Sequence, residues 1–238
     1  MPIIEEVARA VSDAGVDLAA LGLAWAKAMP AVTLVPAFGL RALPTPARAV
    51  LALALAAAVF PALAPSVHPD VPWALAAVEQ VLAGLPIAVA AAVPLWAATM
   101  AGGLVDNLRG AQEGAQIAVV EGKSTPMGVP LSLLASAIFL GTGGPARVAA
   151  ALSAPPAAHL AERVAADLAG GIAMAVAIGG PLLAAAMVLE VAAALVARAA
   201  SPAQIHALLA PLRALGVLAV MAIVLDRVAA VIAIAVRS

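Results

Sequence analysis

The sequence contains no cysteine and no tyrosine, and it has few aromatic or charged residues. Aromatic residues make up 3% of the chain and charged residues 11%. Without cysteine, the chain can form no disulfide, no thiolate nucleophile and no cysteine-ligated metal site. A soluble domain carries about 25% charged residues, so the shortage of charge argues against a soluble globular protein.

The few charges nearly cancel one another. There are 12 Lys and Arg residues against 13 Asp and Glu residues, for a formal net charge of −1. Proteins that bind DNA or RNA use a basic face to neutralise phosphates, and this chain has too few cations to form one. We therefore expect no nucleic-acid partner.

Apolar residues are abundant: 65% of the chain is hydrophobic, and the mean hydropathy is +1.12. A helix needs about 20 apolar residues to cross a bilayer, and proline residues within such a helix bend it. We therefore predict a single all-α domain over residues 1–238, of the polytopic integral-membrane type, with about six hydrophobic helical segments kinked by Pro and Gly. The charge-poor intervals are 18–40, 49–64, 72–105, 124–146, 168–189 and 214–236.

Charged residues within or directly beside these intervals need an explanation. Glu190 sits in an Ala/Val/Leu run, and Asp226 and Arg227 lie at the centre of the last interval. Each would cost about 2.5–3.5 kcal/mol at the middle of a bilayer. The many Ala and Gly residues also permit close helix packing. These features favour a subunit of a helical assembly, and the alternative is a stand-alone transporter of a solute or ion with Glu190 and Asp226 as a proton relay.

Three motifs of enzymes and ligand-binding proteins fail on their spacing. EGKST at 121–125 lacks the glycine that a phosphate-binding loop needs five residues before Gly122. The serines of the apolar interval 124–146 have no Gly-x-Ser-x-Gly context, and the histidines are too isolated to hold a metal ion. We expect no enzymatic activity, no cofactor and no metal. The residues concerned are Ser132, Ser136, His68, His159 and His206.

One polar stretch remains, GGLVDNLRGAQEG at residues 102–114. Asp106 and Arg109 would share one face of a helix and could pair, which lowers the cost of placing both in apolar surroundings. Asn107 lies between them. The glycines allow either a sharp turn or the close approach of another backbone. From these residues alone, a solvated loop with an incidental ion pair remains the simpler explanation; the glycines are Gly102, Gly103 and Gly110.

The same stretch resembles the SctT family of the type III secretion export apparatus, the counterpart of flagellar FliR. Gly102, Asp106, Arg109 and Gly110 match a Gly-x-x-x-Asp-x-x-Arg-Gly pattern of that family, and this pattern favours the injectisome branch over the flagellar one. The resemblance runs from about residue 36 to residue 231. Its other blocks, in the family's order, are 46–56, 138–156, 181–198 and the SPAQ stretch at 201–204.

The sequence departs from the family pattern in three places. Ile-His-Ala at 205–207 replaces Asn-x-Phe, Arg213 stands in place of a lysine, and Pro145 in place of a histidine. These differences indicate a divergent or specialised system.

The resemblance implies a non-enzymatic, multi-pass subunit of an export gate in the bacterial inner membrane, through which unfolded proteins pass. It implies SctR-like and SctS-like partners (FliP- and FliQ-like), an SctU-like partner and contact with membrane lipid. Residues 102–114 are implied to form a plug, whose gate residues are Gly102, Gly103, Asp106, Asn107, Arg109 and Gly110. Five charges are expected to be buried at contacts between subunits: Glu190, Arg198, Arg213, Asp226 and Arg227.

Overall fold

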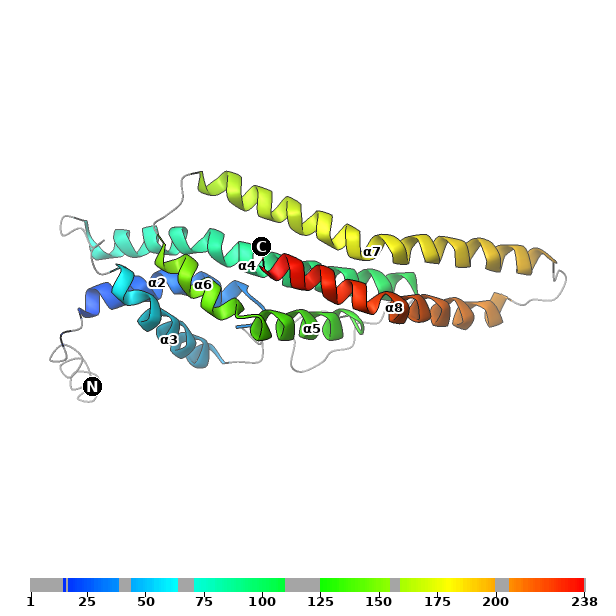
Figure 1. Ribbon diagram of the computed structural model, residues 1–238, viewed down its shortest axis with the longest axis horizontal. Coiled ribbons are helices and arrows are strands. Elements are labelled where there is room, and N and C mark those ends of the chain that lie inside the picture. The colour runs from blue at the N-terminus through cyan, green and yellow to red at the C-terminus, as the bar shows by residue number, and fades with distance from the viewer. Residues whose placement is uncertain are drawn as a thin grey trace. The chain divides into compact units, whose positions relative to one another are not determined.

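Every regular element that the structure describes is an α-helix (Figure 1). The computed structural model describes residues 15, 17–38, 44–63, 71–109, 125–154, 159–199 and 206–237. Over these residues there is no strand, so the prediction of an all-α, membrane-type fold is confirmed. The helices are α2 (Leu18–Leu34), α3 (Thr45–Leu63), α4 (Trp73–Leu108), α5 (Gly128–Gly141), α6 (Gly144–Ser153), α7 (Leu160–Ala199) and α8 (His206–Arg237).

Each of the six apolar intervals contains a helix, but the helices differ in length. Three described helices are long and apolar enough to cross a membrane: α4, residues 161–199 of α7 and residues 211–237 of α8. The interval 124–146 holds two helices, α5 and α6, because Gly143 has a positive φ of 77° that interrupts the helix. Counting α5 and α6 as one broken span gives a fourth crossing, whereas α2 and α3 are shorter apolar helices.

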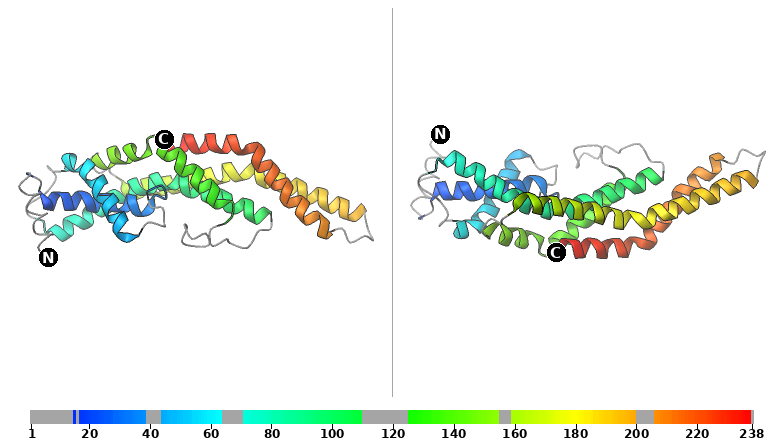
Figure 2. Two further views of the ribbon diagram at one scale, coloured as in Figure 1. Left: turned by 90° about the horizontal axis from the view of Figure 1, so that it is seen from below. Right: turned by 90° about the horizontal axis from the view of Figure 1, so that it is seen from above.

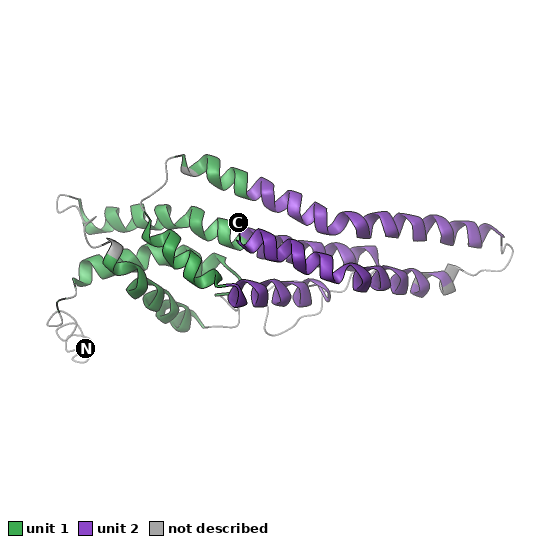
Figure 3. Ribbon diagram, in the orientation of Figure 1, with its two compact units in different colours: residues 1–92, 143–167 green, residues 93–142, 168–238 purple. Residues whose placement is uncertain are grey.

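The chain divides into two compact units (Figure 3). Unit 1 comprises residues 1–92 and 143–167, and unit 2 comprises residues 93–142 and 168–238. One boundary between the units falls at the break between α5 and α6. The other two fall inside the long helices α4 and α7. The expectation of a single domain stays a prediction.

Unit 1 is built on the packing of α2 against α3 and α6. The side chain of Asp17 begins α2 by accepting hydrogen bonds from the backbone amides of Ala19 (2.8 Å) and Ala20 (3.3 Å), which satisfies donors that the helix leaves unpaired. Many of the buried residues of α2 are alanines, such as Ala24 and Ala28. These small side chains let neighbouring helices approach closely.

Lys27 lies at the centre of this unit. It is 2% exposed, and its Nζ donates a hydrogen bond to the carbonyl oxygen of Ala154, at the end of α6, at 3.3 Å. A cation near the C-terminus of a helix is stabilised by the helix dipole. The backbone of Lys27 also faces Gly84 of α4, where an added Cβ would overlap the Lys27 carbonyl oxygen. Lys27 therefore contacts two other helices, one through its side chain and one through its backbone.

Unit 2 contains the rest of α4 and α7 together with α5 and α8. Figures 1 and 2 both show the C-terminal half of α7 beside the N-terminal half of α8. α5 packs against α8. A Cβ at Gly179 of α7 would lie 2.5 Å from the Leu104 side chain of α4, and a Cβ at Gly216 of α8 would lie 2.8 Å from the Leu189 side chain of α7. The lack of a side chain at Gly179 and at Gly216 therefore allows the close spacing of α7 with α4 and with α8.

The contact between Gly84 and Lys27 gives a direct test of this packing. We expect Gly84→Ala to lower the stability of the purified protein by about 1–3 kcal/mol, because the new methyl group overpacks against backbone. The measurement is thermal unfolding in detergent followed by circular dichroism. The matched control is Gly170→Ala in α7, where nothing lies within 4 Å of an added Cβ and helix propensity favours alanine. Equal stability of the two variants would contradict the described contact.

Candidate functional site

The candidate site lies where α4 ends and α5 begins, within unit 2. α4 continues to Leu108, so Gly102 and Gly103 lie inside a helix. A sharp turn, one of the two uses of glycine that the sequence allowed, is therefore absent at these two positions. Gly110 and the rest of the stretch 102–114, residues 111–114, lie outside the described residues.

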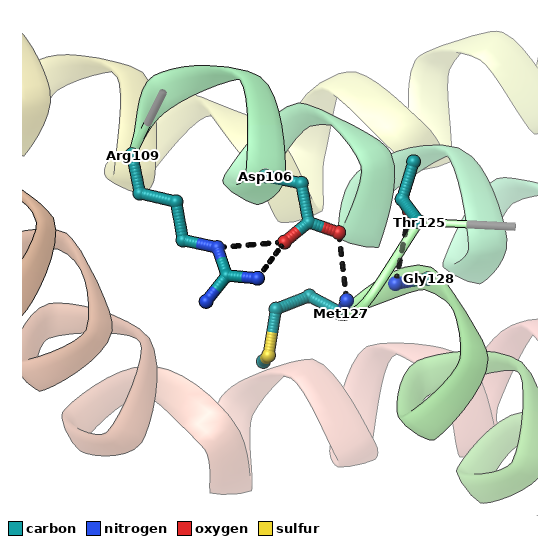
Figure 4. Close-up of polar contacts among 5 residues, drawn as sticks. All are labelled: Asp106, Arg109, Thr125, Met127 and Gly128. Atoms are coloured by element: carbon teal, nitrogen blue, oxygen red, sulfur yellow. Dashed lines mark hydrogen bonds and ion pairs between the residues drawn. The ribbon is translucent and has the colours of Figure 1, made fainter. Parts of the chain in front are cut away.

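Asp106 is the centre of the site (Figure 4). Its side chain is fully buried. One carboxylate oxygen, Oδ1, accepts from Nε of Arg109 at 2.8 Å and pairs with Nη2 of the same guanidinium at 2.6 Å. The other oxygen, Oδ2, accepts from the backbone amide of Met127 at 2.7 Å. The ion pair between Asp106 and Arg109 that the i,i+3 spacing predicted is thus present. Asp106 has a further partner in Met127, directly before α5.

The contact with Met127 follows from the way α5 begins. Met127 precedes the first residue of α5 and supplies no side-chain cap of its own. The first amides of a helix need acceptors from outside it, and a carboxylate at this end is also favoured by the helix dipole. Asp106 provides one acceptor, and Oγ1 of Thr125 provides another to the amide of Gly128 at 3.1 Å.

Gly102 brings the two helices into contact beside this carboxylate. A Cβ at Gly102 would lie 2.5 Å from Cα of Gly128 and 2.6 Å from the carbonyl oxygen of Met127. The next residue, Gly103, has more room, because its Cβ would lie 3.7 Å from Oγ1 of Thr125. Of the two uses of glycine that the sequence left open, Gly102 serves the close approach of another backbone.

These contacts form a structural latch, which we call the Asp106 latch and define as Asp106, Arg109 and Met127. Both carboxylate oxygens of Asp106 accept hydrogen bonds from donors within the chain. Arg109 and Met127 lie just outside the two ends of the segment 110–124. The latch therefore fixes both ends of that segment through one buried carboxylate. Asn107 is exposed and takes no part in it.

The sequence analysis missed the residues that α5 contributes to the site. Thr125 and Pro126 form a recognisable helix-start signal, so the beginning of α5 could have been found. Nothing in the sequence indicated that the amide of Met127 would meet Asp106, 21 residues away.

The five charges expected at contacts between subunits lie on α7 and α8, and none is buried within the chain. Glu190 and Arg213 form an ion pair at 3.0 Å, with side chains that are 61% and 42% exposed. Arg198, Asp226 and Arg227 are exposed. Burial of these charges requires another chain, so their role at contacts between subunits stays a prediction.

Across the part of the chain that the structure describes, no group of three or more His, Asp or Glu residues could hold a metal ion. His159 pairs with exposed Glu162 at 3.7 Å. His68 lies outside the described residues.

Long apolar helices, held together by glycine contacts and one buried ion pair, define the chain as a helical protein of the membrane type. The chain belongs to the bacterial export proteins, family 1, whose family model matches residues 18–237. This confirms the resemblance to the SctT and FliR proteins and gives the chain a role in the protein export apparatus. No curated protein sequence matches the chain.

The neighbouring glycines of α4 provide a matched pair of variants. We expect Gly102→Ala to destabilise the protein by about 1–3 kcal/mol, because the methyl group would collide with the α5 backbone and separate Asp106 from Met127. Gly103→Ala should leave stability unchanged or raise it slightly, since its contacts are of ordinary length. Thermal unfolding in detergent compares the two. If Gly102→Ala were as stable as Gly103→Ala, the α4–α5 contact described above would be incorrect.

Proposed function

We propose that the chain is a non-enzymatic subunit of the export gate of a type III secretion system, which conducts unfolded proteins across the bacterial inner membrane. The observation that carries the proposal is the Asp106 latch, which joins the two ends of segment 110–124. Family membership supports the export role. The three long apolar helices support a multi-pass location in the inner membrane.

In this proposal the stretch 102–114 is the plug of the gate. Its helical part, up to Leu108, carries the latch, and the remainder leaves α4 directly after Arg109. Breaking a buried ion pair by removing one partner typically costs 3–5 kcal/mol, and Arg109 is 19% exposed, so we place the cost here at the lower end. A latch of this strength holds the plug closed at rest and still opens when other components of the apparatus supply energy.

The expected partners are SctR-like, SctS-like and SctU-like subunits, together with membrane lipid. The support comes from the uncovered faces of the last two helices. Only 22% of the apolar window of α7 and 22% of that of α8 is buried, against 56% for α4. The Gly-x-x-x-Asp-x-x-Arg-Gly match favours the injectisome branch.

The stand-alone transporter is the weaker alternative. It requires Glu190 to exchange protons freely, whereas Glu190 is engaged by Arg213 at 3.0 Å. It also requires the chain to insert and transport on its own.

Ion leak through resting membranes tests the plug. We expect Asp106→Ala and Arg109→Ala to make membranes that contain the assembled gate leakier to small ions, because each variant removes a side chain that holds the ends of the segment together. Asp106→Asn should have a smaller effect, since its side-chain oxygen can still accept from the Met127 amide. The measurement is ion-flux through bacterial membranes in the absence of secretion.

The control is Asn107→Ala, on the same turn of α4 but exposed and outside the latch. It should leave the leak at the wild-type level. Unchanged leak and unchanged secretion in both latch variants, with the chain present in normal amounts, would remove the plug role.

A further inference from the structure

Asp226 and Arg227, which we call the α8 charge pair, lie on a part of α8 that the rest of the chain leaves uncovered. Both side chains are exposed. Neither forms a hydrogen bond or an ion pair with any other residue that the structure describes. Their apolar neighbour Ile223 is 80% exposed. The two charges therefore stand in an open apolar surface.

The position of the α8 charge pair along the helix makes this exposure costly. The apolar part of α8 runs between Arg213 and Arg237. At about 1.5 Å per residue, the pair lies roughly 20 Å from Arg213 and about 15 Å from Arg237. A bilayer core is about 30 Å thick, so the pair falls near its middle. Charged side chains at that depth are almost always matched by protein or by a wet cavity.

The surface around Asp226 is shaped to receive another helix. Ala222 and Ala230 lie one turn before and one turn after Asp226 on the same face, and both are exposed. Small residues at this spacing let a second helix approach closely in a membrane. The small side chains beside Asp226 would thus let a second helix come close enough for the two helix backbones to touch.

The charges limit what can cover this surface. Consecutive residues on an α-helix point about 100° apart, so one side chain cannot serve both Asp226 and Arg227. A lipid headgroup would lie at the membrane surface and could match only the arginine. A covering group must bring charges of both signs to the depth of the pair.

We infer that the α8 charge pair docks a membrane-spanning helix of another subunit, which presents a carboxylate to Arg227 and a lysine or arginine to Asp226. This inference rests on the proposed function, because it places the partner within the export gate. It names the chemistry by which that partner is recognised: opposite charges at mid-membrane depth beside small residues.

The first experiment measures recovery of the partners. The chain is expressed with its neighbouring genes and purified in detergent, and the co-purifying subunits are quantified. We expect Asp226→Asn and Arg227→Gln each to lower that recovery on the order of tenfold, the change that corresponds to losing one buried charge contact of modest strength. Asp226→Glu and Arg227→Lys, which keep the charges, should restore much of it. The control Glu162→Gln, at a side chain that is 80% exposed near the start of α7, should have no effect.

The second experiment uses the absence of cysteine from the chain. Ala222→Cys and Ala230→Cys each place a single thiol beside the α8 charge pair without altering it. In the chain purified alone, where only detergent covers the pair, the small uncharged reagent N-ethylmaleimide should label both thiols. In the assembled gate both should be protected until the sample is denatured.

The outcomes separate the two proposals. A wild-type chain that purifies alone and functions alone would overturn the proposed function. If the complex forms and the charge-neutral variants keep their partners, the docking inference is overturned while the gate proposal stands. Labelling of both thiols in the complex would show that no helix covers the pair, and a disulfide between two copies of the Ala222→Cys chain would show self-association. Either result would also overturn the inference.

Discussion

The structure around the candidate site depends on one buried carboxylate. Asp106 is enclosed by apolar helices, and an unpaired carboxylate there would be strongly unfavourable. It therefore needs its donors, and those donors come from two places: the guanidinium of Arg109 at the end of α4 and the amide of Met127 at the start of α5. The donors that satisfy this one charge thus hold the end of α4 against the start of α5. The polar contact supplies specificity that apolar packing between alanine-rich helices lacks.

The second constraint is the absence of side chains at helix contacts. Gly102 lies against the backbone of α5, and Gly179 of α7 lies against a leucine of α4. A core in which many of the buried residues are alanines gains less from each side chain than a core of large residues, so close contacts between helices contribute more to its stability. Such packing tolerates added volume poorly. It also leaves α7 and α8 with broad uncovered apolar faces, as expected of a subunit whose packing is completed by lipid or by other chains.

Much of the fold could be predicted because hydropathy is a local property. The apolar intervals contain the helices, and the i,i+3 spacing of Asp106 and Arg109 correctly placed them in contact. The use of Gly102 and Gly103 could not be predicted, because glycine permits both turns and close approach, and only the surrounding structure decides between them. The contact with Met127 joins residues far apart in the sequence, so no local pattern revealed it. The exposed Asp226 and Arg227 could be recognised as unusual, but no local pattern in the sequence shows what, if anything, pairs with them.

The family gives the chain a role in bacterial protein export, and the latch gives that role a specific element. Asp106 ties the end of α4 to the start of α5 through a few polar contacts. In the proposed gate, these few polar contacts are what opening has to break.

The central claim is that Asp106 holds the two ends of segment 110–124 together. It is tested most directly by the double variant Gly103→Cys with Thr125→Cys, because a Cβ added at position 103 would lie 3.7 Å from Oγ1 and 3.8 Å from Cγ2 of Thr125, so the two side chains would be in contact. The chain has no other cysteine, so the rate of disulfide formation under a mild oxidant reports the proximity of the two ends. The account predicts rapid formation in the otherwise wild-type chain and roughly tenfold slower formation when Asp106→Ala, which removes the acceptor for the Met127 amide, is added. Equal rates in the two backgrounds would contradict it.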